Sequence, residues 1–133
     1  MAETSGLNHL GLAVQSLEKT TSFFVDLLGW EESGRDDTYP RTAVSDGHMR
    51  LTLWEIDRSL SGAEFDRRRN VGLHHLALTV ESEATLLSIL EKLRAHPDVT
   101  IEFEPEKVGA GPRVHMMCSE PSGLRIEFLW SGE

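Results

Sequence analysis

The chain has 133 residues, a length typical of one domain, and 22 acidic against 13 basic residues give it a net charge of −9. This negative charge argues against nucleic acid or an anionic membrane as a general partner, because both are bound by neutralising phosphates with Lys and Arg. The first residues lack a signal-peptide pattern, no apolar run approaches the roughly 20 residues that cross a bilayer, and the single Cys118 excludes an internal disulfide. A cytoplasmic protein is therefore expected.

The first half of the sequence predicts a β-α-β-β-β order. Residues 7–14 form an apolar run typical of a strand, and Ser16 is a suitable N-cap for a helix that ends at Gly29. Three short strands are then expected, separated by turn signals, at residues 30–33, 41–45 and 49–56. Residues 57–72 are polar and weakly periodic, which indicates a connection.

The second half predicts the same order of elements. Residues 73–80 read as a strand and residues 81–96 as a helix that Pro97 terminates, with strands at 99–103, 114–118 and 124–130. The chain is thus predicted to be a single α+β domain over residues 1–133. Its parts are module one at about 6–56, the connection at 57–72 and module two at about 73–130.

An internal repeat relates the two halves. A shift of 66 positions brings residues 7–14 (LNHLGLAV) onto residues 73–80 (LHHLALTV) and superimposes His9 on His75. Ser16 falls on Ser82 under the same shift. Such a repeat predicts two similar modules that place their histidines symmetrically, and it makes His75, not His74, the counterpart of His9.

Glu127 interrupts an otherwise apolar strand. Alternation places it on the face opposite Ile126 and Phe128, where it is expected either at an exposed edge or beside a cationic partner. Imidazoles from two strands and a carboxylate from a third form a 2-His-1-carboxylate set. His9, His75 and Glu127 are therefore candidate ligands of a divalent metal ion.

The repeated modules, together with NHLGLAV (8–14), FFVDLLGW (23–30) and EPSGLRIE (120–127), resemble the vicinal oxygen chelate superfamily. This group includes glyoxalase I, bleomycin resistance proteins, fosfomycin-modifying thiol transferases, methylmalonyl-CoA epimerase and extradiol dioxygenases. The resemblance spans about residues 6–130. It implies a glyoxalase-like fold in which the first-strand histidines and the last-strand glutamate, here His9, His75 and Glu127, bind the metal.

The resemblance leaves a fourth ligand position open. Glyoxalase I and the epimerase have another acidic or amide ligand on the last strand of module one, where aligning Trp54 with Trp130 places Leu51 opposite Glu127. Leucine cannot bind a metal, so a three-ligand site is expected. Glu55, four residues along the same strand face as Leu51, reaches the site only if the register shifts.

The resemblance implies a glyoxalase I-like lyase or isomerase that acts on a small substrate through a divalent ion (Zn, Ni, Mn or Fe(II)), within a homodimer. Candidate bases are Glu55, His115 and Glu127, and Lys107 and Arg113 are expected to hold an anionic substrate.

Three alternatives stay open. Three ligands also suit an extradiol-type dioxygenase or a fosfomycin-resistance-type thiol transferase, although the latter has a threonine where this chain has Gly11. The alternative of another class is a bleomycin-resistance-type protein that binds a ligand without catalysis.

Overall fold

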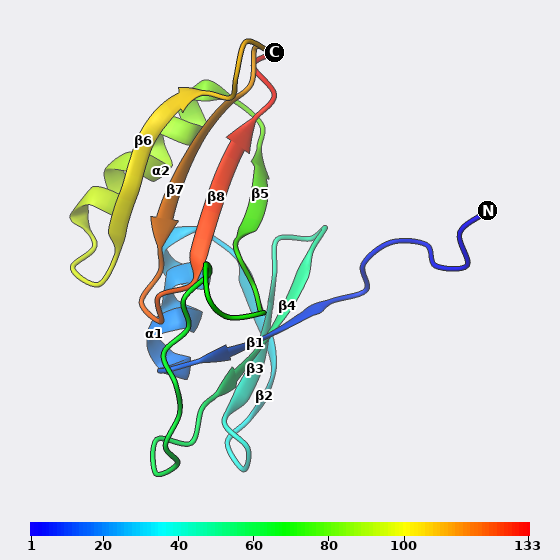
Figure 1. Ribbon diagram of the computed structural model, residues 1–133, viewed down its shortest axis with the longest axis vertical. Helices are drawn as coiled ribbons and strands as arrows, with labels where there is room; N and C mark the ends of the chain where they lie inside the picture. The colour runs from blue at the N-terminus through cyan, green and yellow to red at the C-terminus, as the bar shows by residue number, and fades with distance from the viewer. The chain divides into compact units, whose positions relative to one another are not determined.

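The computed structural model describes all residues 1–133, which form two compact units, Met1–Leu60 and Ser61–Glu133. The first unit contains β1 (Leu10–Val14), α1 (Leu17–Ser22), the π-helical turn η1 (Phe23–Leu27), β2 (Glu31–Asp36), β3 (Arg41–Ser45) and β4 (Arg50–Glu55). The second contains β5 (Leu76–Val80), α2 (Glu83–Ala95), β6 (Thr100–Lys107), β7 (Val114–Ser119) and β8 (Arg125–Trp130). The predicted β-α-β-β-β order is confirmed for both (Figure 1).

Each unit forms one four-stranded sheet with the same topology. The strand orders are β1-β4-β3-β2 and β5-β8-β7-β6, and the second series is visible in Figure 1 as neighbouring green, red, brown and yellow strands. In each sheet the first and last strands of the unit pair in parallel, and the other pairs are antiparallel. The strand that carries Glu127 is therefore interior, with a neighbour on each side.

One face of each sheet is buried against the helix of its unit. In the second unit, Leu86, Leu90 and Leu93 recur at helical spacing along α2 and are buried, as are Ile126 and Phe128 of β8. Burial of side chains of this size contributes roughly 1.5–3 kcal/mol each. No helix of the structure has the length and hydropathy needed to cross a membrane.

The lone thiol belongs to this apolar core. Cys118 of β7 is fully buried, and removal from water raises the pKa of its thiol to about 12. Cys118 thus fills apolar space in the core.

The repeat extends to the helix starts and to the positions of the histidines. Ser16 Oγ accepts a hydrogen bond from Lys19 N at 3.2 Å, and Ser82 Oγ accepts one from Thr85 N at 3.1 Å, so both serines are N-caps. The first strands are shorter than predicted, because parallel pairing begins only at Leu10 and Leu76. The two repeat histidines consequently lie immediately before β1 and β5.

Candidate functional site

Strand register identifies the residue of the first unit that corresponds to Glu127. Gly11 of β1 pairs with Thr52 of β4, and its repeat counterpart Ala77 of β5 pairs with Glu127 of β8. The prediction that Leu51 is the counterpart of Glu127 is therefore wrong by one residue. Leu51 corresponds instead to Ile126, and both are fully buried beneath the helices.

Thr52 is engaged in packing within the first unit. Its hydroxyl accepts a hydrogen bond from Trp54 Nε1 at 3.0 Å, and a Cβ added to Gly11 would lie 3.2 Å from Thr52 Oγ1. The guanidinium of Arg41 lies 5.4 Å from the centre of the Trp54 ring, and Tyr39 packs edge-on against that ring at 5.1 Å. The position equivalent to Glu127 thus carries a neutral hydroxyl beside an aromatic cluster.

Glu55 lies on the opposite side of β4 from Thr52, because it is three residues further along the strand. Its Oε1 accepts a hydrogen bond from Leu17 N at 3.0 Å, at the start of α1, and lies 3.9 Å from the guanidinium of Arg58. The hydrogen bond from Leu17 stabilises the N-terminus of the helix, and Arg58 partly balances the charge of the carboxylate. The expectation that Glu55 acts as a base finds no support in them.

The first repeat histidine has its ring orientation fixed by the residue before it. His9 Nδ1 lies 2.7 Å from Asn8 Oδ1. Because an amide oxygen only accepts hydrogen bonds, the proton of this contact belongs to His9 Nδ1. His9 Nε2 is then the nitrogen with a free lone pair, as a metal-ligand imidazole requires.

The second repeat histidine has an equivalent anchor, provided by His74. Arg125 donates hydrogen bonds to His74 Nδ1 at 3.2 Å and to the His74 carbonyl oxygen at 3.1 Å, so this Nδ1 is unprotonated. The 2.8 Å contact between His74 Nδ1 and His75 Nδ1 must then take its proton from His75, which leaves His75 Nε2 free. Desolvation and the nearby charge of Arg125 lower the pKa of His74, in accord with a neutral ring.

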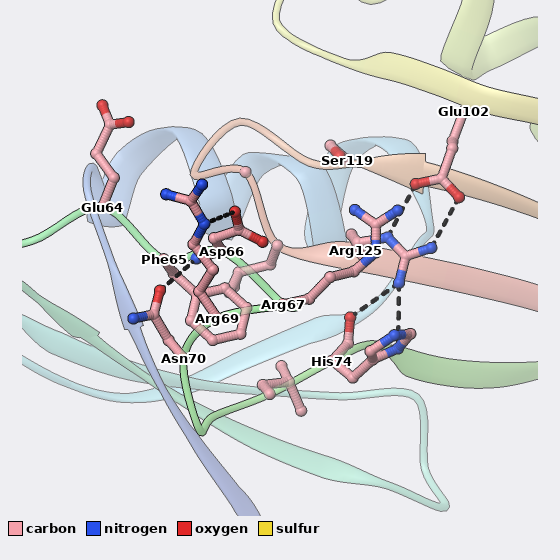
Figure 2. A pocket seen from close by; sticks show the side chains of 13 residues that line it. Glu64, Phe65, Asp66, Arg67, Arg69, Asn70, His74, Glu102, Ser119 and Arg125 are labelled. Carbon is pink, nitrogen blue, oxygen red and sulfur yellow. Dashed lines mark hydrogen bonds and ion pairs between the residues drawn. The ribbon is translucent and has the colours of Figure 1, made fainter.

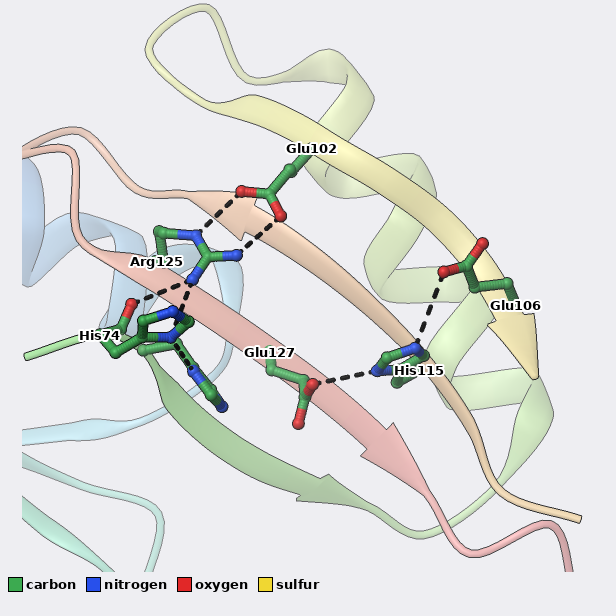
Figure 3. A network of polar contacts seen from close by, with 7 residues as sticks. His74, Glu102, Glu106, His115, Arg125 and Glu127 are labelled. Carbon is green, nitrogen blue, oxygen red and sulfur yellow. Dashed lines mark hydrogen bonds and ion pairs between the residues drawn. The ribbon is translucent and has the colours of Figure 1, made fainter. Parts of the chain in front are cut away.

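Glu102 holds Arg125 in this arrangement. Its two carboxylate oxygens accept hydrogen bonds from Arg125 Nε at 2.9 Å and from the NH2 group at 2.7 Å. The hydrogen bonds and the charge of Arg125 lower the pKa of Glu102, and the carboxylate in turn raises the pKa of Arg125. Figure 3 shows the resulting chain of contacts from Glu102 through Arg125 to His74.

Glu127, a carboxylate in an otherwise apolar strand, has a histidine as its partner. His115 Nδ1 of β7 lies 3.0 Å from Glu127 Oε2, and both side chains are largely buried, at 18% and 13% exposed. The other oxygen, Oε1, has no protein partner. The helix-free face of the second sheet thus places a carboxylate with one open oxygen beside an imidazole (Figure 3).

The surroundings of His115 suit a group that exchanges a proton. Its Nδ1 donates to the Glu127 carboxylate, so Nε2 carries the lone pair in the neutral ring. Glu106 lies 3.8 Å from Nε2, and the Phe103 ring packs 4.8 Å from the imidazole. The imidazole therefore lies between two carboxylates, with Nδ1 toward Glu127 and Nε2 toward Glu106.

The two cations predicted to bind substrate lie at the hairpin end of the β6–β7 pair, one or two residues from the paired positions Glu106 and His115. Lys107 ends β6 and Arg113 directly precedes β7, so both belong to the exposed hairpin between these strands. Their side chains have no ion-pair partner in the structure. Sequence reasoning missed His74 and Arg125 as supports of His75; the signal available was that Asn8 and His74 occupy equivalent places in the repeat.

His9, His75 and Glu127 each offer a donor atom of a kind that divalent ions bind. Two imidazoles with free Nε2 atoms and a carboxylate with an open oxygen are ligands that Zn²⁺, Mn²⁺ and Fe²⁺ accept. No group of three or more His, Cys, Asp or Glu side chains is preformed as a metal-binding cluster in the structure.

Comparison with known proteins gives consistent matches over nearly the whole chain. The sequence profile of the Glyoxalase/Bleomycin resistance protein/Dioxygenase superfamily matches residues 6–128. A glyoxylase/bleomycin resistance protein/dioxygenase domain from Frankia sp. EAN1pec superimposes with a TM-score of 0.79 at 24% identity, covering 96% of this chain and 93% of that one.

Two further solved structures share this fold at lower identity. Lactoylglutathione lyase from Agrobacterium tumefaciens gives a TM-score of 0.72 at 17% identity and covers 98% of this chain and 97% of its own. The fosfomycin resistance protein FosX from Listeria monocytogenes gives 0.71 at 20% identity, with 96% and 93% covered. At these identities the likeness shows the fold, two glyoxalase-like βαβββ modules, and no particular reaction.

Proposed function

Because the chain belongs to the Glyoxalase/Bleomycin resistance protein/Dioxygenase superfamily, we propose that it is a divalent-metal-dependent lyase or isomerase for a small substrate with two adjacent oxygens. His9, His75 and Glu127 are the proposed metal ligands. The observation that carries the proposal is the duplicated anchoring of the histidines: Asn8 and His74, equivalent in the repeat, each engage the Nδ1 atom of the histidine that follows. Both histidines are thereby held in the tautomer that presents Nε2 to a metal.

The chemistry divides between the ion and the protein. A bound divalent ion supplies a Lewis acid that stabilises negative charge on substrate oxygens. His115 removes a proton next to the substrate carbonyl, because Glu127 orients its ring and leaves Nε2 unprotonated. Glu106 then lies close enough to stabilise the imidazolium until the proton is returned to the neighbouring carbon.

A three-ligand site supports a second candidate, a ring-cleaving dioxygenase that uses iron(II). The counterpart of Glu127 in module one is Thr52, whose hydroxyl is bound to Trp54. No fourth carboxylate ligand is therefore expected, and an iron(II) ion held by His9, His75 and Glu127 would supply the chemistry that activates dioxygen. Turnover of catechol with consumption of oxygen, in place of turnover of a glutathione–methylglyoxal adduct, would favour this candidate; thiol addition to fosfomycin would favour a thiol transferase.

Metal content tests the proposal directly. Protein purified without chelator is expected to contain about one equivalent of a divalent metal per chain, by elemental analysis. His75→Ala and Glu127→Ala should lose it, whereas His48→Ala, which changes an exposed loop histidine, should retain it. Trace metal in the unaltered protein, unchanged in His75→Ala, would falsify the enzyme proposal and favour a ligand-binding protein without catalysis.

We also propose that the protein is a homodimer, as is common for proteins built from paired modules of this kind. Sedimentation equilibrium at micromolar concentration should return twice the chain mass of 14.9 kDa. A monomer would refute this part of the proposal without affecting the metal site.

A further inference from the structure

The second unit contains a pocket of about 640 Å³ that none of the predicted site residues lines (Figure 2). One wall comes from the segment that precedes β5, with Phe65 and Arg67, and the opposite wall from the start of β8, with Leu124 and Arg125. The sequence had suggested only a polar connection for the first of these walls.

This segment is folded on itself. The Asp66 carbonyl oxygen accepts hydrogen bonds from Arg69 N at 2.9 Å and Asn70 N at 2.8 Å, and Asp66 N donates to Asn70 Oδ1 at 2.6 Å. Phe65 packs on Gly72 so closely that a Cβ there would lie 2.7 Å from its ring. Arg67 and Phe65 therefore extend from an ordered turn, which makes the pocket wall a defined structure.

Three arginines and three carboxylates line the pocket, but none of these carboxylates forms an ion pair with Arg67. Arg125 is held by both oxygens of Glu102, and Arg69 lies 3.7 Å from Asp66. Arg67 has no carboxylate within ion-pair distance, and its charge acts from further away on Glu102, where it contributes to the lowered pKa of that carboxyl. Figure 2 shows its guanidinium beside that of Arg125, whereas Glu64 lies at the far edge of the pocket with its carboxylate directed away. The region around the two guanidinium groups thus holds two positive charges and one negative charge.

We propose that this pocket binds the carboxylate of a small organic acid, with Arg67 as the direct ligand. The planar guanidinium matches a carboxylate in a two-hydrogen-bond arrangement, and one bound carboxylate balances the excess charge. The apolar side chains of Phe65, Leu73 and Leu124 line the same pocket and accommodate a hydrocarbon body. The ligand class is therefore a monocarboxylic acid with an apolar portion.

The position of the pocket connects it to the proposed chemistry, and this step rests on the proposed function. Arg125 and Glu127 lie on the same face of β8, two residues and so roughly 7 Å apart. A carboxylate bound at Arg67 would anchor one end of a substrate whose reactive end reaches Glu127 and His115. Lys107 and Arg113, expected from the sequence to hold an anion, lie beyond the other end of β7.

Binding of simple acids tests the pocket without any metal. Chelator-treated protein is titrated with hexanoate, with hexan-1-ol as the neutral analogue and with inorganic phosphate, and binding is followed by amide chemical shifts in NMR. Hexanoate is expected to bind in the millimolar range, with shifts at residues 65–74 and 123–125, and hexan-1-ol at least about tenfold more weakly. Arg67→Gln should weaken hexanoate binding about tenfold, and the adjacent Arg68→Gln, which lies outside the pocket, less than about twofold.

The outcomes separate the pocket from the metal site. Equal binding of hexanoate and hexan-1-ol, equal effects of the Arg67 and Arg68 substitutions, or preferential binding of phosphate would each overturn the carboxylate assignment. Because the titration uses metal-free protein, it does not depend on metal content, and loss of the metal proposal would leave its result unchanged. Arg67→Gln is expected to retain metal binding, measured separately, which would show that the pocket and the metal site can be tested independently.

Discussion

The two modules hold the same backbone frame and differ in the side chains on the helix-free faces of their sheets. Both have the same strand order, a serine N-cap on the helix and a histidine before the first strand whose Nδ1 is engaged by the preceding residue. At the paired positions on the last strands, module one has Thr52 and module two has Glu127.

The strands beside these positions, β3 and β7, also carry different side chains at equivalent places. Arg41 in module one occupies the register position that His115 occupies in module two, and it packs on Trp54, while His115 bonds to Glu127. The two modules thus share the residues that shape their backbone, whereas the His115–Glu127 pair has no equivalent in module one. This difference teaches that symmetry of backbone does not imply symmetry of chemistry.

The largest expected effect is a difference in metal affinity between variants at the equivalent positions Thr52 and Glu127. Glu127→Ala should weaken binding of a divalent ion by about 100-fold or more, because it removes a proposed ligand. Thr52→Ala should leave metal affinity within about twofold, although it removes the Trp54 hydrogen bond and costs about 1 kcal/mol of folding free energy. Competition with a chromophoric chelator measures the affinities, and similar losses in both variants would contradict the asymmetry.

The next prediction concerns the equivalent residues Gly11 and Ala77. Gly11→Val should destabilise the protein by about 1–3 kcal/mol, because its Cβ alone meets Thr52 Oγ1 at 3.2 Å and Trp54 Nε1 at 3.6 Å. Ala77→Val, at an exposed place on β5, should change stability by less than about 0.5 kcal/mol. Urea denaturation provides both values. An equal loss of stability in the two variants would show that Thr52 and Trp54 do not restrict the space above Gly11.

The histidine anchors are predicted to act alike in the two modules. Asn8→Ala and His74→Ala should each weaken metal binding about tenfold, because His9 or His75 then loses the contact that fixes its tautomer. The ¹⁵N chemical shifts of the imidazoles report the tautomers independently of any activity. If His9 and His75 kept the Nδ1–H tautomer in these variants, Asn8 and His74 would not be what fixes it.

The smallest effect concerns stability against pH. The pKa of Glu102 is lowered in the folded protein by its bonds to Arg125, so its contribution is present above the unfolded value near 4.5 and is lost as the pH falls through the lower folded pKa. Glu102→Gln should therefore cost about 1 kcal/mol at pH 7, and less as the pH approaches 3. Urea denaturation at the two pH values measures the change.

Arg50 provides the control for this prediction. It is the module-one counterpart of Arg125 by register, but it is exposed and has no ion pair. Arg50→Gln should leave the pH dependence of stability unaltered. If Glu102→Gln lowered the free energy of unfolding by the same amount at both pH values, packing and not charge would support Arg125.

The sequence by itself determined the features that depend on local patterns. Apolar periodicity and turn residues gave the β-α-β-β-β order, the 66-residue shift paired His9 with His75, and strand alternation put Glu127 on the face opposite Ile126. Each follows from contacts within one strand or helix, or from comparison of one segment with its copy.

Tertiary structure alone decided which side chains meet across strands and loops. Alignment on tryptophans missed the true counterpart of Glu127 by one residue, and in a strand an error of one residue moves every side chain to the other face. The Glu127–His115 contact and the pocket at Arg67 were equally hidden, because they depend on the pairing of β7 with β8 and on the turn before β5. Pairing register and loop closure are set by interactions between segments distant in sequence, which no single segment encodes.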